Sequence, residues 1–334
     1  MELGVIWFIL IGILFAGFFF LEGFDFGVGI LLLLIGRKDT EKRIIINTIG
    51  PVWDGNEVWL ITAGGAIFAA FPNWYATMFS GFYLALLIIL VALILRGVAF
   101  EFRSKNESEN WRNNWDKIIF ISSMLLAILF GVALANLIKG VPIDKSMNYV
   151  GSFFDLISIY TLVAGVTTLL VFISHGAVFL ALKADKSIET RALKIAKPFG
   201  AAAIVVSILL IGLTFLQTDL FHSKLALLSA LVSLVALILS WYLIVLKKAK
   251  IAMITNGLSI VLGVATLFLG LFPRVMVSSI NSEYSLTIAN ASSSLYTLTL
   301  MTKVAVIFVP IVLGYQAWTY WIFRKRVTPK DIEY

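Results

Sequence analysis

The sequence contains no cysteine and only two histidines, and charged residues make up just 13% of its 334 positions. Without cysteine the chain forms no disulfide, no thiolate metal site and no cysteine-ligated iron–sulfur cluster, and it lacks a cysteine nucleophile. Soluble domains carry about one-quarter charged residues, whereas 60% of this chain is hydrophobic. The apolar residues form blocks long enough to cross a bilayer as helices, for which about 20 residues suffice. Composition therefore predicts an all-α polytopic membrane protein.

Hydropathy predicts about nine transmembrane helices along the chain. The first follows Met1-Glu2-Leu3, which lacks the basic segment and cleavage site of a signal peptide, so it is expected to stay in the membrane. The second and third are expected to form a tight hairpin broken at Phe71-Pro72-Asn73-Trp74, because proline ends helices and tryptophan favours the membrane interface. The predicted spans are 5–36, 48–71, 75–101, 116–138, 155–183, 198–218, 225–246, 251–272 and 295–323.

The distribution of basic residues predicts how the chain is oriented. Twenty of the 26 Lys and Arg residues fall in the odd-numbered loops and the C-terminal tail, and four fall in the even-numbered loops. Because cytoplasmic loops collect Lys and Arg, the N-terminus is predicted outside and the C-terminus in the cytoplasm. An odd number of spans requires the same result. The isoelectric point near 9.5 then reflects topology, and no nucleic-acid partner is needed to explain it.

Two cytoplasmic segments resemble each other. Gly36-Arg37-Lys38-Asp39 follows the first span, and Lys183-Ala184-Asp185-Lys186 follows the fifth. Two interpretations stay open: an internal repeat, with two four-helix bundles and one additional helix, or a basic composition that two cytoplasmic loops simply share. The repeat predicts a first four-helix unit with buried acids, a second four-helix unit, and a ninth helix with a cytoplasmic tail, at residues 1–150, 151–290 and 291–334.

The first two predicted spans each contain a pair of carboxylates. A charge at mid-depth in a bilayer costs at least about 2.5–3.5 kcal/mol, so each one needs an explanation. Glu22 and Asp25 are three residues apart in the first span and therefore share a helix face. Asp54 and Glu57 repeat this spacing in the second span, with Glu57 one turn deeper. Two such pairs predict an intramembrane functional site.

The third span ends toward the cytoplasm with Arg96 and Glu101. Carboxyl groups held within a membrane can pass protons over short hydrogen-bonded water steps. Ordered by depth from the cytoplasm, the acids predict a proton pathway that runs through Glu101, Asp54, Glu57, Asp25 and Glu22, supported by Trp53, Asn56 and Arg96. The alternative is structural: Arg96 and one or two of the acids form a buried ion pair that locks the helices, and Glu101 is a solvated helix end.

The two histidines are predicted to lie on opposite sides of the membrane. His175 falls near the inner end of the fifth span, and His222 falls in an external loop. The pair therefore cannot hold one haem between them. His175 alone could be an axial ligand, but a lone histidine on a helix is more often a hydrogen-bonded packing residue, and this is the role expected for it. For this chain we predict no catalytic residue, no metal ligand and no cofactor-binding residue.

Motifs that span nearly the whole chain carry a family resemblance. They are Gly23-Phe24-Asp25-Phe26-Gly27-Val28-Gly29, Trp53-Asp54-Gly55-Asn56, Trp111-Arg112-Asn113-Asn114-Trp115-Asp116, Gly140-Val141-Pro142 and Ala317-Trp318-Thr319-Tyr320-Trp321. With these motifs the chain resembles subunit II of the cytochrome bd quinol oxidases. Relatives often have Asp at the position of Glu101, and Pro where Gly97 stands.

The resemblance implies a heterodimer in the bacterial inner membrane that serves the respiratory chain as an electrogenic terminal oxidase. Its subunit I would bind quinol, two b-type haems and one d-type haem, and the complex would reduce dioxygen to water. This chain would then support assembly and supply a cytoplasmic proton route through Asp54 and Glu101. Small accessory subunits are left open. Two other classes are weighed against this one: a proton-coupled transporter that uses the same acids, and a membrane scaffold with buried ion pairs.

Overall fold

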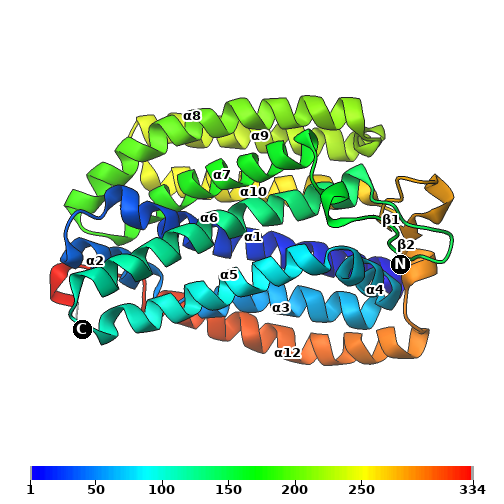
Figure 1. Ribbon diagram of the computed structural model, residues 1–334, viewed down its shortest axis with the longest axis horizontal. Coiled ribbons are helices and arrows are strands. Elements are labelled where there is room, and N and C mark those ends of the chain that lie inside the picture. The colour runs from blue at the N-terminus through cyan, green and yellow to red at the C-terminus, as the bar shows by residue number, and fades with distance from the viewer. Residues whose placement is uncertain (1, 332–334) are drawn as a thin grey trace.

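The computed structural model describes residues 2–331, which are almost entirely helical (Figure 1). Nine helices of 18 residues or more occur in this part of the chain and run side by side along its long axis. They are α1 (Leu3–Ile35), α3 (Trp53–Ala70), α5 (Tyr83–Phe102), α6 (Glu109–Lys139), α7 (Ile159–Lys183), α8 (Lys186–Gln217), α9 (Lys224–Val245), α10 (Ala249–Leu271) and α12 (Leu295–Ile322). The shorter elements are α2 (Asp39–Ile49), α4 (Pro72–Gly81), α11 (Ile288–Ala291) and the two-stranded sheet of β1 (Arg274–Met276) and β2 (Leu286–Thr287).

Eight of the long helices are long and apolar enough to cross a membrane by themselves. The ninth, α3, has 18 residues, and its first two turns hold Asp54, Asn56 and Glu57. These polar side chains lower its hydropathy, yet α3 lies within the bundle, packed against α1 and α12. The prediction of an all-α polytopic membrane protein is confirmed, and α3 is placed among the spans by its packing.

Several predicted boundaries differ from those of the helices, most of all at the third and sixth spans. The break between the second and third spans begins at Phe71, but Pro72 starts the extra helix α4, and the third long helix begins at Tyr83 instead of residue 75. Proline suits a first helical position because its missing N–H would have no partner there. The sixth span was expected at 198–218, but α8 already begins at Lys186, where the Asp185 carboxylate caps it by accepting from two backbone N–H groups.

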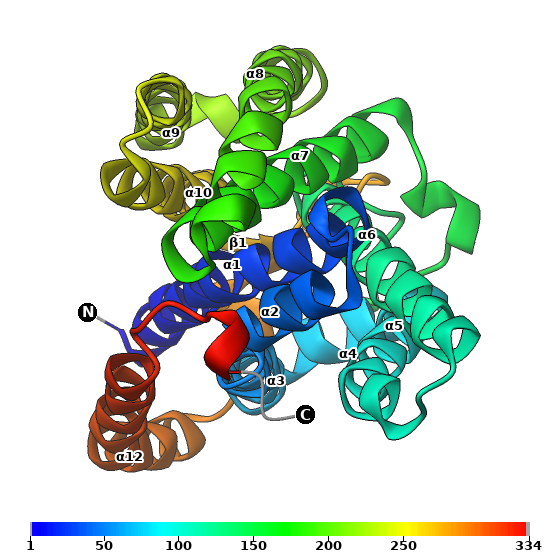
Figure 2. The ribbon, with the colours of Figure 1, turned by 90° about the vertical axis from the view of Figure 1, so that its left-hand side faces the viewer.

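The view from one end shows α1 near the centre of the bundle, with α3, α5 and α6 on one side and α7 to α10 on the other (Figure 2). α1 packs against α3, α6, α7 and α10, and α12 lies at the edge beside α3 and α1. Gly27 of α1 and Gly176 of α7 let the backbones of these two helices lie against each other, because a Cβ at Gly176 would lie 2.5 Å from the backbone of Gly27. The division into units 1–150, 151–290 and 291–334 stays a prediction.

The two ends of the bundle differ in charge and structure. The short sheet and the start of α1 lie at one end, whereas α2 and the turn Pro329–Asp331 lie at the other (Figure 1). The loops predicted to be cytoplasmic meet at the α2 end, which we call the cytoplasmic end. α12 also finishes there, so the described chain enters and leaves on opposite sides, as the basic residues predicted.

Candidate functional site

Five side chains from three helices meet inside the bundle, and we call them the acid cluster: Glu22, Asp25, Asn56, Glu57 and Arg96. Glu22 and Asp25 of α1 and Arg96 of α5 are completely buried, and the side chain of Glu57 is 17% exposed. One guanidinium nitrogen of Arg96, Nη1, donates to Oε1 of Glu22 and, at 2.8 Å, to Oε1 of Glu57. The ion pair therefore ties α1, α3 and α5 together.

Aromatic rings enclose the charged end of Arg96. Its Cζ atom lies 4.8 Å from the ring centroid of Phe26 and 5.3 Å from that of Phe100. A guanidinium over an aromatic face is attracted by the negative face of the ring, most strongly where water is excluded. These rings hold Arg96 at the depth where it faces both glutamates.

Asn56 links the acid cluster to α12. Its Nδ2 donates to Oδ2 of Asp25 at 2.6 Å, and its Oδ1 accepts from the hydroxyl of Tyr320 at 2.8 Å and from Nε2 of Gln316 at 3.4 Å. The Nε1 of Trp59 in turn donates to Oε1 of Gln316 at 2.8 Å. Sequence reasoning missed Gln316 and Tyr320, although their spacing of four places both on one face of α12.

The acid cluster contains more acid than base. Three carboxyl groups surround one guanidinium, so full ionisation would leave two uncompensated negative charges in an apolar interior, where unpaired charges are strongly disfavoured. Oε2 of Glu22, Oδ1 of Asp25, and Nε and Nη2 of Arg96 have no hydrogen-bond partner within residues 2–331. Bound protons would restore the charge balance, and the oxygens without a partner could carry them. The chemistry available here is proton binding and release.

The two other predicted acids lie outside the acid cluster. Asp54 is exposed in the first turn of α3, and Glu101 is exposed at the cytoplasmic end of α5. Nearby, Trp53 packs on Phe100 with ring centroids 5.3 Å apart. The structure therefore separates the five predicted acids into two at the surface and three inside. Between them, Asn56 and Arg96 contact the inner three directly, whereas Trp53 packs on Phe100, a ring beside Arg96.

Ion pairs at the cytoplasmic end hold α2, the helix that leads into α3. Asp116 of α6 is completely buried and pairs with Lys42 at 2.9 Å and with Arg103 at 2.5 Å. Arg191 of α8 pairs with Glu41 at 2.6 Å. This hydrogen-bonded guanidinium lowers the pKa of the Glu41 carboxyl to about 2. Because α2 ends only a few residues before Asp54, these contacts fix the start of α3.

The two histidines lie far apart, as the sequence predicted. His175 is completely buried in α7, where its Nε2 lies 3.0 Å from the carbonyl oxygen of Phe20. The rings of Phe20 and Phe24 lie 5.6 and 5.9 Å away and occupy the space beside the imidazole. His222 lies in a turn after α8, at the far end of the bundle from the end of α7. Within residues 2–331, no group of three or more His, Cys, Asp or Glu residues could hold a metal ion.

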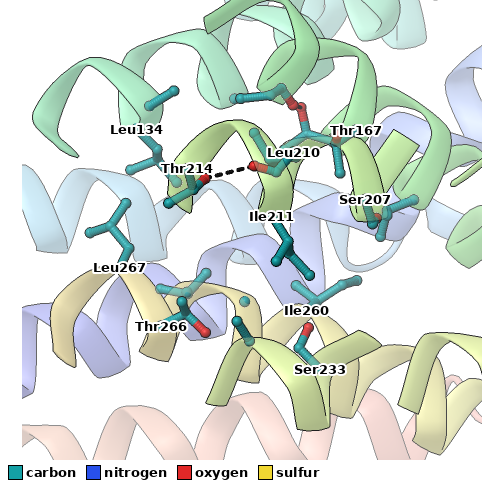
Figure 3. A pocket seen from close by; sticks show the side chains of 18 of the residues that line it. Leu134, Thr167, Ser207, Leu210, Ile211, Thr214, Ser233, Ile260, Thr266 and Leu267 are labelled. Carbon is teal, nitrogen blue, oxygen red and sulfur yellow. Dashed lines mark hydrogen bonds between the residues drawn. The ribbon is translucent and has the colours of Figure 1, made fainter. Parts of the chain in front are cut away.

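A cavity of about 220 Å³ lies between α6, α7, α8, α9 and α10, apart from the acid cluster. Its walls are mostly apolar, with hydroxyl groups from Thr167, Ser207, Thr214, Ser233 and Thr266 (Figure 3). The hydroxyl of Thr214 donates to the carbonyl oxygen of Leu210 at 2.8 Å and lies 3.1 Å from that of Tyr160. The hydroxyls of Thr167, Ser233 and Thr266 also donate to backbone carbonyl oxygens.

Comparisons with known proteins agree with one another. The family model described as cytochrome bd terminal oxidase subunit II matches residues 3–323. The chain is 44% identical to the cytochrome bd ubiquinol oxidase subunit 2 of Bacillus subtilis, covering 98% of this chain and 97% of that protein. It is 38% identical to the cytochrome bd-I ubiquinol oxidase subunit 2 of Escherichia coli K12, covering 98% and 96%. Its fold is similar to a chain in the structure of bd oxidase from Geobacillus thermodenitrificans, with a TM-score of 0.75 at 16% identity, covering 96% and 99%.

Proposed function

The chain belongs to the cytochrome bd terminal oxidase subunit II family, and we propose that its own task in that membrane-bound quinol oxidase is to deliver protons from the cytoplasmic side. The observation that carries this proposal is the acid cluster, in which three carboxyl groups share one guanidinium inside the bundle. Asp54 and Glu101 stand nearer the cytoplasmic end and supply an entrance.

The reaction of such an oxidase sets the demand for protons. Reducing one dioxygen to two waters consumes four electrons and four protons, and two quinols supply the four electrons as they become quinones. Protons that quinol oxidation releases on the outer side of the membrane do not reach a dioxygen site inside it. The protons that form water must therefore come from a second source, the cytoplasm. Carboxyl groups placed between the cytoplasmic end and the bundle interior meet this need.

We place the quinol site, the two b-type haems and the d-type haem in subunit I, the partner of this chain. The packing of His175 supports this placement, because its Nε2 is hydrogen-bonded to the carbonyl oxygen of Phe20 and the rings of Phe20 and Phe24 lie beside the imidazole. The haems would supply electron transfer and dioxygen binding there. The proposed complex can also include small accessory subunits, and no residue of this chain is assigned to contact them.

The exposed face of α3 is proposed as a contact with subunit I. Asp54 lies on it, and a carboxylate that faces lipid is costly. Gly65, eleven residues after Asp54, lies on the same face of α3, and a Cβ at Gly65 would meet no atom within 4 Å. Small residues let a neighbouring helix approach closely. A partner that covers this face would shield Asp54 and continue the proton route.

The test uses the complete two-subunit complex purified from membranes. Asp54→Asn and Glu57→Gln should slow quinol-dependent oxygen uptake while the visible haem spectrum and the subunit ratio stay as in the wild type. Glu107→Gln, at an exposed position of the cytoplasmic loop, is the matched control. If Asp54→Asn loses haem or the partner subunit instead, the residue is structural. A colourless chain that purifies alone would overturn the function as a whole.

The proton-coupled transporter receives no support from the family match. A transporter would need the same acids to couple protons to a solute. The relatives that match over almost the whole chain instead carry the names of oxidase subunits.

A further inference from the structure

A chain of hydrogen bonds leads from α3 through α12 to Asp25. Trp59 donates to Gln316, Gln316 donates to Asn56, and Asn56 donates to Asp25, at 2.8, 3.4 and 2.6 Å. The hydroxyl of Tyr320 adds a second donor to Oδ1 of Asn56 at 2.8 Å. The two middle members are amides, and an amide can present either its oxygen or its nitrogen to a neighbour.

The direction of this chain is set at its first member. An indole N–H is a donor only, so the atom of Gln316 that faces Trp59 must be the oxygen. The amide nitrogen of Gln316 then faces Asn56, which must present its own oxygen in return. The nitrogen of Asn56 is left to point at Asp25. Every bond therefore donates toward the carboxyl group.

The reverse orientation is disfavoured at two places. If the Asn56 amide turned over, its nitrogen would face the nitrogen of Gln316, and its oxygen would face an oxygen of Asp25. Both Asn56 and Asp25 are completely buried, so water cannot relieve either contact, and unmade hydrogen bonds are costly in such a place.

This direction distinguishes the two oxygens of Asp25. Oδ2 always faces a donor and has no room for a proton, whereas Oδ1 has no partner within the described residues. We infer that Trp59, Gln316 and Tyr320 are positioning residues, which orient Asn56 so that Asp25 binds and releases its proton only at Oδ1. The proton arrives and leaves through that oxygen, Oδ2 keeps its hydrogen bond in both states, and no electron moves. The inference rests on the proposed function and names Oδ1 of Asp25 as the atom that carries the proton.

The other charged or titratable groups around Asp25 come from several helices. They are Glu22 on α1 itself, Glu57 from α3, Arg96 from α5 and Tyr320 from α12. α7 brings His175 only to the carbonyl of Phe20, and Asp116 of α6 is paired at the cytoplasmic end. Among these groups, Arg96 gives its Nη1 to the two glutamates. The Asn56 amide donates to Oδ2 of Asp25, and the Glu22 carboxyl lies beside Asp25 on the same helix.

The test compares substitutions that remove one donor each. Tyr320→Phe keeps the ring and loses only the hydroxyl, Trp59→Phe keeps an aromatic side chain and loses the indole N–H, and Gln316→Leu removes the middle amide. Tyr315→Phe is the matched control, because Tyr315 lies on the same helix and is 66% exposed. Each complex is purified whole, its haem content is measured, and the infrared carboxyl band of Asp25 is located by its loss in Asp25→Asn.

The band of the protonated Asp25 carboxyl is expected to shift in all three variants and to stay in place in Tyr315→Phe. The hydrogen bond to the ionised carboxylate is weakened, so the pH profile of oxygen uptake should move by about one unit to higher pH, a tenfold change in proton binding. Arg96, Glu22 and Glu57 remain in every variant.

An unchanged band in Trp59→Phe and Gln316→Leu would overturn the inference, and so would the absence of any Asp25 band in the wild type between pH 5 and 9. If one variant fails to assemble, the other two still decide the question. Should Asp25→Asn leave oxygen uptake intact, the proton route through Asp25 is wrong, whereas a shifted band in the variants would still establish the orientation. The two failures are therefore distinguishable.

Discussion

Arg96 of α5 reaches Glu22 of α1 through the same nitrogen with which it contacts Glu57 of α3. The two N–H groups of this one nitrogen can serve both carboxyl groups, while Nε and Nη2 of the guanidinium have no partner within residues 2–331. Such an arrangement is poor as a pure clamp, because a clamp would use the planar fork of arginine in a bidentate pair. It suits a group that must stay charged while the number of protons on its neighbours changes.

Arg96→Leu should destabilise the complex strongly. The substitution leaves three buried or half-buried carboxyl groups with no cation, and breaking a buried ion pair from one side costs about 3–5 kcal/mol. The measurement is the thermal unfolding temperature of the purified complex. Arg37→Leu, at an exposed position near the start of α2, is the control. A change in Arg96→Leu no larger than in this control would contradict the role of the cluster in joining α1, α3 and α5.

Gly27→Ala should destabilise the contact between α1 and α7. A Cβ at this position would collide with the carbonyl oxygen of Phe172 and would lie 2.9 Å from the backbone of Gly176. Overpacking of this kind costs about 1–3 kcal/mol. Gly212→Ala in α8 is the matched control, because its Cβ would meet no atom within 4 Å. Yield and thermal stability are compared, and equal values for the two variants would show that the helices are not packed as described.

Glu41→Gln should weaken the cytoplasmic end in a pH-dependent way. The pKa of Glu41 falls from 4.5 to about 2 through its hydrogen bond with Arg191. A lowered pKa stabilises the folded state fully above pH 4.5, and this contribution is lost as the pH falls toward 2. Because the pair is partly exposed, the effect at neutral pH is about 0.5–1 kcal/mol.

The free energy of unfolding of the wild type and of Glu41→Gln is measured at pH 7 and at acidic pH. The difference should be present at pH 7 and shrink below pH 4.5. Glu107→Gln, at an exposed loop position, should show no such trend. A difference that grows on acidification would mean that the Arg191 contact does not carry the effect.

Asp116→Asn should loosen α2 and α6 from each other. The carboxylate is completely buried and is shared by Lys42 and Arg103. A neutral amide leaves both cations poorly compensated, with a cost of about 3–5 kcal/mol for a buried pair. Limited proteolysis between residues 36 and 50 reports the release of α2. Asp144→Asn, on the opposite side of the membrane, is the control, and equal cleavage in the two variants would refute the prediction.

Sequence patterns predicted the membrane class, the orientation of the chain and the presence of the three carboxyl groups of the acid cluster inside the spans, because each of these depends on local properties. A block of apolar residues must become a helix in lipid whatever surrounds it, and basic loops report their side of the membrane without any knowledge of packing. The spacing of three between Glu22 and Asp25 determined their common face in the same way. The start of α8 was predicted too late because its polar first turns carry no hydropathy signal.

The tertiary structure alone decided which side chains meet. Arg96 contacts Glu22, 74 residues away in the sequence, and Tyr320 contacts Asn56 across 264 residues, so no local pattern could pair them. It also decided which acids are buried, since Asp54 and Glu57 lie one turn apart on α3 and only Glu57 faces the cluster. Hydropathy measures the cost of placing a charge in lipid, but only the packing of the helices determines whether that charge finds a partner.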